Sequence, residues 1–179
     1  MSYLAPERLA AHHELADFLC SSEEQTTWLR EYARQADAAR TSTVFVVTEE
    51  SGTVVVAYYA WCMASVRIDR APARLRKGAG RYPQPVALLS RLGTDIRHER
   101  KGLGAALMTD MFRRLMALSG DIGCRGLLIH CETPEAREFY RHLVPEFMPG
   151  PTDELHLYLL LKDIRKTLDR AFRQTAHRP

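Results

Sequence analysis

The sequence predicts a single α/β domain, and three observations support this. Its 179 residues (20.4 kDa) fall within the roughly 100–200 residues of one domain. Runs of β-branched and aromatic residues around a glycine-containing turn predict a β-hairpin over 43–68. A strand–helix–strand pattern over 86–131 predicts a right-handed parallel crossover. The composition, 46% apolar and 26% charged, excludes disorder and low complexity as descriptions of the whole chain.

Two helices are expected before the hairpin. A short one covers 6–18, where Leu9, Leu15 and Phe18 recur at nearly helical intervals. The second begins at Ser22, because the run Ser-Glu-Glu-Gln has the form of a capping box. Apolar residues then repeat at helical spacing, namely Trp28, Leu29, Tyr32, Ala33 and Ala36.

A long basic loop follows the hairpin, whose strands cover 43–48 and 53–68. Between 69 and 85, three prolines and two glycines interrupt any regular element, which predicts an irregular loop. Its 70–81 part holds five cations and no acid: Arg70, Arg74, Arg76, Lys77 and Arg81. Such a loop can attract phosphate groups, although a solvated surface segment explains the charges as well.

The second half of the chain predicts the crossover and three further elements. An apolar strand over 86–92 precedes a helix over 103–118 and a second apolar strand over 126–131. The next helix starts at Thr133, which can cap it, with Pro134 suited to its first turn, and Pro145 ends it. A strand over 154–161 comes last, and 165–179 form a basic C-terminal helix or tail of the single domain 1–179.

The four cysteines are expected to be reduced. They form no Cys-x-x-Cys pair, which disfavours zinc, and no metal is expected. Cys124 and Cys131 flank a strand that would hold them about 20 Å apart, whereas a disulfide tolerates at most about 7 Å. The net charge is +3, the apolar runs are shorter than the roughly 20 residues of a membrane span, and the N-terminus lacks a secretory pattern. We therefore expect a soluble, cytoplasmic protein with no membrane partner.

The most informative segment is 91–107, in which a strand ends, a short turn follows and a helix begins with Gly-x-Gly. Free N–H groups at a helix N-terminus bind phosphate oxygens, and Gly102 and Gly104 let a ligand approach the backbone. Taken alone, the pattern fits a plain tight turn equally well. A dinucleotide fingerprint would need a third glycine where Leu107 stands, and the Gly-Lys-Ser/Thr of a nucleoside-triphosphate loop is absent. A different diphosphate ligand is therefore indicated.

Residues 99–105 resemble the Gln/Arg-x-x-Gly-x-Gly/Ala signature of the GNAT superfamily of N-acetyltransferases. The similarity covers roughly residues 6–164 and follows the order found in the GNAT toxins of type II toxin–antitoxin modules. The matching segments are Trp28-Leu29, Tyr58-Tyr59-Ala60, 85–91, 102–104, 122–126, His130, 135–140 and 155–164. Glu99 departs from the signature, and Ala57 stands where these toxins usually have glycine. The resemblance implies a GNAT fold, with a mixed, mostly antiparallel central sheet, a parallel βαβ crossover and helices on both faces.

The resemblance also implies a co-substrate, an acceptor and a partner. The co-substrate is acetyl-CoA, bound through Glu99, Arg100, Lys101, Gly102, Leu103, Gly104 and Ala105. The acceptor is the α-amine of an aminoacyl-tRNA, whose acetylation blocks translation, and a ribbon-helix-helix antitoxin that also binds operator DNA holds the toxin inactive. A homodimer is compatible with the sequence. Two other functions stay open, namely acetylation of a small amine or a protein, and non-catalytic binding of acyl-CoA.

Tyr140 is the first catalytic candidate, because the resemblance places this tyrosine near the coenzyme sulfur as a general acid. A phenol of pKa about 10 can protonate a leaving thiolate of reference pKa about 8.5. The alternative is that Tyr140 packs in the core beside Phe139. Leu92, Gly93 and Thr94 form an irregular strand end whose N–H groups can face a developing oxyanion, or Gly93 merely marks a bulge.

The candidates for tRNA binding are Arg74, Arg76, Lys77 and Arg91. Arg91 lies in an apolar strand, where a guanidinium needs a partner, so an RNA phosphate and a salt bridge fit equally well. No general base is evident, since a lone His130 is more typical of a structural histidine. An α-amine of pKa near 8 needs less help than a lysine amine near 10.4, so this fits an α-amine acceptor. Cys62 and Cys131 lack a recognisable histidine and carboxylate, which disfavours an acyl-cysteine route.

Overall fold

The computed structural model describes residues 2–50 and 52–176. Its strands are β1 (Glu7–Arg8), β2 (Thr43–Thr48), β3 (Val55–Val66), β4 (Gln84–Thr94), β5 (Gly126–His130), β6 (Met148–Pro149) and β7 (His156–Leu160). Its helices and helical turns are α1 (Glu23–Thr27), η1 (Trp28–Tyr32), α2 (Ala33–Ala38), η2 (Ile68–Arg70), α3 (Ala73–Arg76), η3 (Ile96–His98), α4 (Leu103–Leu118), α5 (Pro134–Leu143) and α6 (Leu161–Ala176).

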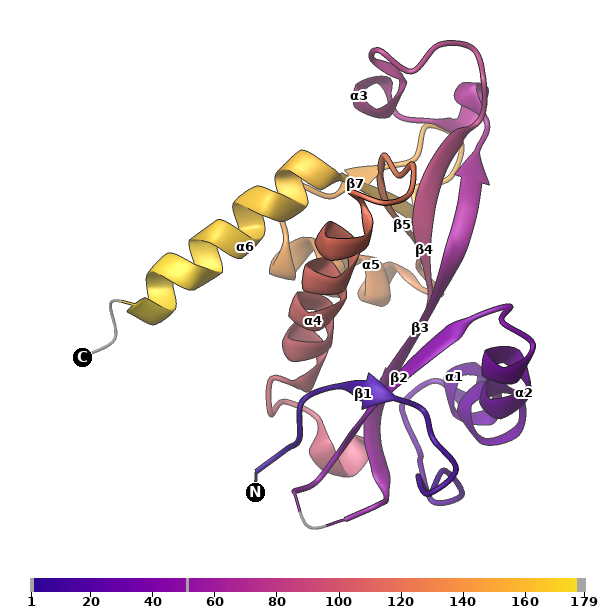
Figure 1. Ribbon diagram of the computed structural model, residues 1–179, viewed down its shortest axis with the longest axis vertical. Helices are drawn as coiled ribbons and strands as arrows, with labels where there is room; N and C mark the ends of the chain where they lie inside the picture. Colours follow the sequence, from indigo (N-terminus) through magenta and orange to yellow (C-terminus); the bar gives the residue numbers. More distant parts are fainter. Residues whose placement is uncertain (1, 51, 177–179) are drawn as a thin grey trace. The chain divides into compact units, whose positions relative to one another are not determined.

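The strands pair in the order β1-β2-β3-β4-β5-β7-β6 (Figure 1). β4 and β5 run parallel, as the predicted crossover requires, and the pairs β1–β2, β2–β3, β5–β7 and β6–β7 are antiparallel. The predicted mixed α/β sheet is therefore confirmed. The chain divides into two compact units, Met1–Cys62 with Leu89–Asp110, and Met63–Leu88 with Met111–Pro179.

The first unit confirms the capped helix and corrects the helix predicted upstream of it. The Ser22 side chain accepts a hydrogen bond from the Gln25 N–H at 3.2 Å, and helical structure continues through the π-helical turn η1 to α2. The helix predicted over 6–18 is wrong, because this segment forms the edge strand β1, two turns and an isolated bridge between Glu14 and Val54. Leu9 N–H donates to Val44 O at 2.9 Å, and β1 pairs with β2. The edge of β2 offers backbone partners that a local spacing pattern does not reveal.

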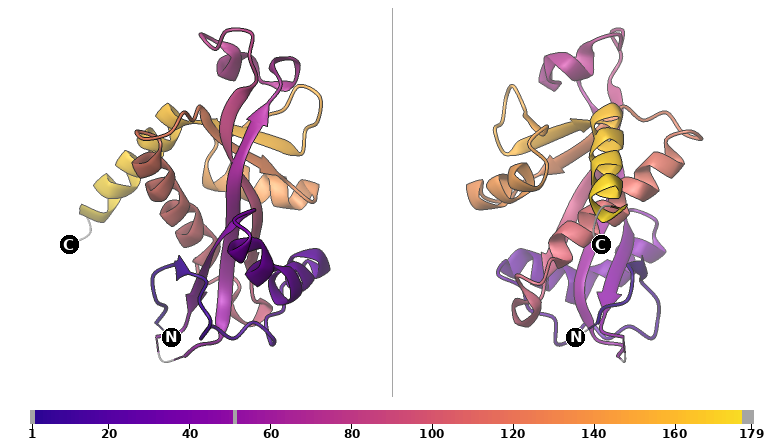
Figure 2. Two further views of the ribbon diagram at one scale, coloured as in Figure 1. Left: turned by 45° about the vertical axis from the view of Figure 1, so that its right-hand side comes forward. Right: turned by 90° about the vertical axis from the view of Figure 1, so that its left-hand side faces the viewer.

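The second unit is built around the β5–β7 pair, with α5 beside it (Figure 2). A Cβ at Gly126 would lie 2.2 Å from Leu159 O, so only glycine allows this strand contact. The cap of α5 is as predicted: the Thr133 side chain accepts from the Ala136 N–H at 3.2 Å, and Pro134 occupies the first turn. β6 was not predicted, since two residues, one of them a proline at the edge of the sheet, carry no strand pattern.

The basic loop departs from expectation, whereas the expected basic C-terminal helix is present. The prediction of no regular element over 69–85 is wrong, because α3 forms a single turn around Leu75, which is buried against Val86 and Leu128. Most of the basic tail is the helix α6. Residues 177–179 lie outside the described residues, as do the side chains from 172 onward. The four cysteines are free, as predicted: Cys20, Cys62, Cys124 and Cys131. Among the described residues, no helix has the length and apolarity that crossing a bilayer requires.

Candidate functional site

The turn between β4 and α4 has the geometry of an anion-binding nest. Arg100 and Gly102 have positive φ angles of 59° and 80°, while Lys101 between them does not. Such alternation turns successive N–H groups toward one point. α4 begins at the next residue, Leu103, and its first N–H groups have no partner within the helix. The predicted segment 99–105 therefore combines a left-handed turn with the start of a helix, which are the two backbone features that can bind an anion.

Space for a ligand lies over Gly102. A Cβ at this position would meet no atom within 4 Å, so a phosphate group can approach the backbone. Arg100 is the costlier residue, because a non-glycine in the left-handed region is strained by about 1–2 kcal/mol. The Glu99 side chain is exposed and adds an acidic group where the GNAT signature has Gln or Arg. The residues therefore fit a diphosphate through main-chain donors.

Asp95, which the sequence analysis missed, anchors this turn. Its side chain is fully buried, and Oδ2 accepts from the Leu19 N–H at 3.0 Å. Oδ1 accepts from the N–H and from Nε of Arg97, at 2.9 and 2.8 Å. Burial by itself raises the pKa of Asp95, but the hydrogen bonds from Arg97 and Leu19 outweigh it and lower the pKa to about 2. The Arg97 guanidinium is committed to this carboxylate and to the carbonyl of Asp17.

We expect the acid stability of the first unit to depend on Asp95. Because its folded pKa of about 2 lies below an unfolded value of about 3.9, the ionised carboxylate contributes about 2 kcal/mol of stability above pH 4. This contribution disappears as the pH falls through 2. Asp95→Asn should lose about 1–3 kcal/mol at pH 7 and flatten the decline between pH 4 and 2 in chemical denaturation. Asp69→Asn, which removes an exposed carboxylate beside Arg67, is the control. An unchanged acid limb in Asp95→Asn would refute this assignment.

The predicted acetyl-binding strand end is held by close packing. β4 continues through Leu92, Gly93 and Thr94. A Cβ at Gly93 would lie 2.9 Å from Cε1 of Tyr58 and 3.3 Å from Cζ of Phe18. Both rings are fully buried, so the glycine is needed because an aromatic ring occupies the space of its side chain.

Gly93→Ala should therefore destabilise the protein by about 1–3 kcal/mol, since the Tyr58 ring cannot move without disturbing the core. Gly120→Ala is the matched control, because a Cβ there meets nothing within 4 Å and no unusual φ is required. Urea denaturation of both variants tests this expectation. Equal stability of the two variants would show that Tyr58 does not restrict position 93.

Tyr140 is buried on α5 in the second unit, with 7% of its surface exposed. Its ring packs edge-on against Phe139 and Phe147. Burial, and to a smaller degree the Cys131 thiol, raises the pKa of Tyr140 above its ordinary value. The phenol therefore stays protonated at neutral pH, which suits a proton donor and not a base. Burial raises the pKa of Cys131 to about 11, so this thiol is a poor nucleophile.

The structure separates the predicted RNA-binding cations of the second unit into two groups. Arg74 forms an ion pair at 2.8 Å with Asp163, whose side chain is 4% exposed. Arg76 and Lys77 are exposed and form no hydrogen bond or ion pair through their side chains within the described part of the chain. Arg74 is therefore tied to α6, whereas the other two are available to a ligand.

Comparison with known proteins assigns the family. No profile of a known protein family matches the chain. A tRNA-acetylating toxin of Mycobacterium tuberculosis (strain ATCC 25618 / H37Rv) is 36% identical over 163 residues, which cover 91% of this chain and 95% of that protein. The chain belongs to the GNAT family of tRNA-acetylating toxins.

Solved structures of AtaT share the fold of this tRNA-acetylating toxin family member. AtaT complexed with acetyl-methionyl-tRNAfMet matches with a TM-score of 0.83 and 21% identity, over 92% of this chain and 98% of that one. A tyrosine-to-phenylalanine mutant of AtaT bound to acetyl-CoA and the C-terminus of the antitoxin AtaR gives a TM-score of 0.77 and 21% identity, over 93% and 97% of the two chains. At this identity the two structures establish the fold.

Arg91 of this family member interacts with two residues of the first unit. It forms an ion pair with Glu24 at 2.7 Å and lies 5.6 Å from the centre of the Trp28 ring. The Trp28 ring stacks on Tyr58, at 6.0 Å and an interplanar angle of 8°. Of the two alternatives for Arg91, the structure shows the salt bridge. Its side chain is 27% exposed, so the guanidinium also remains within reach of solvent.

His130 of this family member is paired with a second histidine. Its ring stacks on His156 of β7 with the ring centres 4.0 Å apart. Burial, together with the charge of His156, lowers the pKa of His130 despite the opposing effect of Asp153. The ring is therefore neutral at pH 7. The stacking explains its presence at the strand end without a catalytic role.

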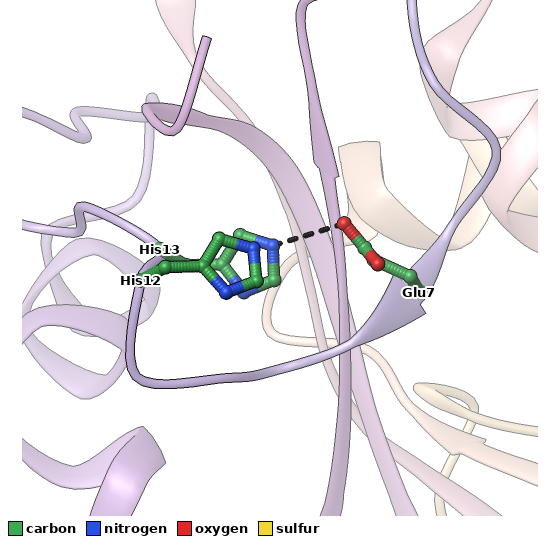
Figure 3. A group of neighbouring side chains, drawn as sticks. All are labelled: Glu7, His12 and His13. Carbon is green, nitrogen blue, oxygen red and sulfur yellow. Dashed lines mark hydrogen bonds and ion pairs between the residues drawn. The ribbon is translucent and has the colours of Figure 1, made fainter.

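One cluster of this toxin family member has the composition of a metal site. Ligand atoms of Glu7, His12 and His13 lie within 4.8 Å of one another (Figure 3). However, Nδ1 of His13 accepts the Ala10 N–H at 2.9 Å, so the proton of the neutral ring is on Nε2, which donates to Glu7 at 3.1 Å. A ligating nitrogen must be unprotonated, so a cation would have to break the Ala10 bond. The arrangement does not fit a divalent cation and instead fastens the N-terminal segment to β1.

Proposed function

We propose that this chain transfers the acetyl group of acetyl-CoA to the α-amine of an aminoacyl-tRNA and thereby blocks translation. The observation that carries the proposal is its 36% identity, over 91% of the chain, to a tRNA-acetylating toxin. The left-handed turn and the open space over Gly102 support it, because a GNAT enzyme binds the diphosphate of its coenzyme at such a turn. AtaT, which shares the fold, binds acetyl-CoA and acetyl-methionyl-tRNAfMet.

The proposed coenzyme site lies in the first unit. Acetyl-CoA supplies an activated thioester. The main-chain donors of 99–105 hold its diphosphate, and the N–H groups of Leu92, Gly93 and Thr94 stabilise negative charge on the acetyl oxygen. Asp95 keeps this turn in place through Leu19 and Arg97.

Proton transfer in the proposed reaction rests on Tyr140. The substrate amine forms a bond to the acetyl carbon, and the carbon–sulfur bond breaks. The phenol of Tyr140 donates its proton to the departing sulfur, the amine releases one proton to solvent, and the phenolate regains one proton from solvent. An α-amine of pKa near 8 is partly neutral at cellular pH, so the chain needs no strong base.

The remaining parts of the proposal concern partners and location. Arg76 and Lys77 bind tRNA phosphates, with Arg74 and Arg91 as weaker contributors because both are ion-paired. A ribbon-helix-helix antitoxin inhibits the chain, in keeping with the AtaR segment bound to AtaT. The whole chain, 1–179, acts as one acetyltransferase domain in the cytoplasm, where charged tRNA is made, and a homodimer is compatible with this role.

The test uses the purified chain with acetyl-CoA labelled on the acetyl group. Label should enter charged tRNA but not the same tRNA after deacylation, and mild alkali should release it as an N-acetyl amino acid. Efficient labelling of a free amine or a peptide, with charged tRNA untouched, would favour the small-amine or protein acetyltransferase. Binding of acetyl-CoA in calorimetry without transfer to any acceptor would favour a non-catalytic acyl-CoA-binding module.

A further inference from the structure

An exposed tyrosine stands among cations in the loop between α3 and β4. Tyr82 is 76% exposed, more than any other large hydrophobic side chain among the described residues. Three exposed cations lie within six residues of it, namely Arg76, Lys77 and Arg81. The 70–81 run holds no acid that would neutralise them.

Two side chains of the same unit donate hydrogen bonds to the backbone around this tyrosine. Gln84 is 4% exposed, and its Nε2 donates to the carbonyl of Tyr82 at 2.6 Å and to that of Ala79 at 3.0 Å. Arg125 donates to the carbonyls of Leu75 and Lys77, at 3.0 and 2.9 Å. These donors bind three carbonyls of the loop and one of α3, which gives the loop a defined path. Less entropy is then lost when the loop binds a ligand.

The surroundings of Tyr82 favour a nucleic acid over a protein partner. A protein hot spot needs neighbouring side chains that exclude water around the buried ring. The near neighbours of Tyr82 in the loop are Gly78, Ala79, Gly80 and Pro83, which offer little apolar surface, together with the cations. An isolated ring among cations is instead the composition of a platform on which an unpaired base stacks while the flanking phosphates are neutralised.

We propose that Tyr82 stacks on an unpaired base of the acceptor RNA, while Arg76, Lys77 and Arg81 contact the adjoining phosphates. The inference rests on the proposed function, because that function makes aminoacyl-tRNA the acceptor. It adds an uncharged contact that recognises single-stranded nucleotides, which a cationic surface alone does not distinguish from paired ones.

The experiment measures binding of uncharged tRNA by fluorescence anisotropy over a series of KCl concentrations. Tyr82→Ala should weaken binding by about 5- to 100-fold without changing the slope of log affinity against log salt. Tyr82→Phe should bind within twofold of the wild type, and Tyr82→Leu should lose as much as Tyr82→Ala, since leucine keeps apolar area but cannot stack. Neutralising the pair Arg76→Gln and Lys77→Gln should instead make the slope shallower by about 1.5–2.

Three results would overturn the stacking role. If Tyr82→Ala bound tRNA with wild-type affinity, the loop would contact the RNA only through its charges. Retained affinity in Tyr82→Leu would replace stacking by apolar contact. Normal RNA binding with loss of antitoxin binding in Tyr82→Ala would assign the tyrosine to a protein partner. An unchanged midpoint of urea denaturation shows that each variant is folded. Failure of the proposed function would be seen separately, as absence of transfer by the wild type.

Discussion

Replacing Tyr140 by phenylalanine is expected to slow acetyl transfer at least about tenfold while acetyl-CoA still binds. The change removes one hydroxyl and keeps the ring that packs against Phe139 and Phe147, so the core of the second unit should persist. Because burial raises the pKa of the phenol, the wild-type rate should not fall between pH 7 and 9 through loss of its proton. The kcat with charged tRNA, and the dissociation constant for acetyl-CoA from calorimetry, measure the two effects separately.

Tyr158→Phe is the matched control for this substitution. Tyr158 lies in the same unit, is 3% exposed, and its pKa is also raised by burial. Its hydroxyl donates to the Arg70 carbonyl at 3.4 Å, a contact with no place in the proposed chemistry. We expect its kcat to stay within about twofold of the wild type. An equal loss in both variants, or no loss in Tyr140→Phe, would refute the catalytic role. Tyr140 would then be a buried packing residue.

Features determined by neighbouring residues could be predicted from the sequence. Ser22 and Thr133 cap the helices that follow them, because capping needs only an oxygen and an N–H three residues later. The hairpin strands and the crossover follow from local periodicity in the same way. The helix predicted over 6–18 is wrong because the same apolar spacing also fits a non-helical chain. The strand that determines its structure by pairing with it, β2, lies more than thirty residues away.

In the candidate site, too, features determined by neighbouring residues could be predicted, whereas those that depend on distant residues could not. The left-handed turn at Gly102 and the helix start at Leu103 are visible in the local sequence. Asp95 was missed because its partner Leu19 is 76 residues distant, and nothing near Gly93 reveals that the Tyr58 ring fills its side-chain space. Arg74 was grouped with the RNA-binding cations for the same reason, since Asp163 is 89 residues away. Long-range partners decide which cations are available to a ligand.

Gly102→Ala should weaken acetyl-CoA binding at least about tenfold and cost about 1 kcal/mol of stability. Two separate causes act. Alanine is strained at a φ of 80°, and its methyl group would enter the open space over the nest, where nothing else lies within 4 Å. The second cause acts only when a ligand is present, so calorimetry with acetyl-CoA and urea denaturation of the free protein distinguish them.

Gly78→Ala isolates the strain from the steric effect. Gly78 has a φ of 74°, and a Cβ there also meets nothing within 4 Å, but it belongs to the basic loop and not to the turn before α4. Its stability loss should equal that of Gly102→Ala, whereas acetyl-CoA affinity should stay at the wild-type value. If both variants weakened acetyl-CoA binding alike, backbone strain would explain the loss and the diphosphate would have to bind elsewhere. A loss confined to Gly102→Ala would place the ligand at the turn before α4, because both substitutions put alanine at a positive φ and neither new methyl group meets a protein atom within 4 Å.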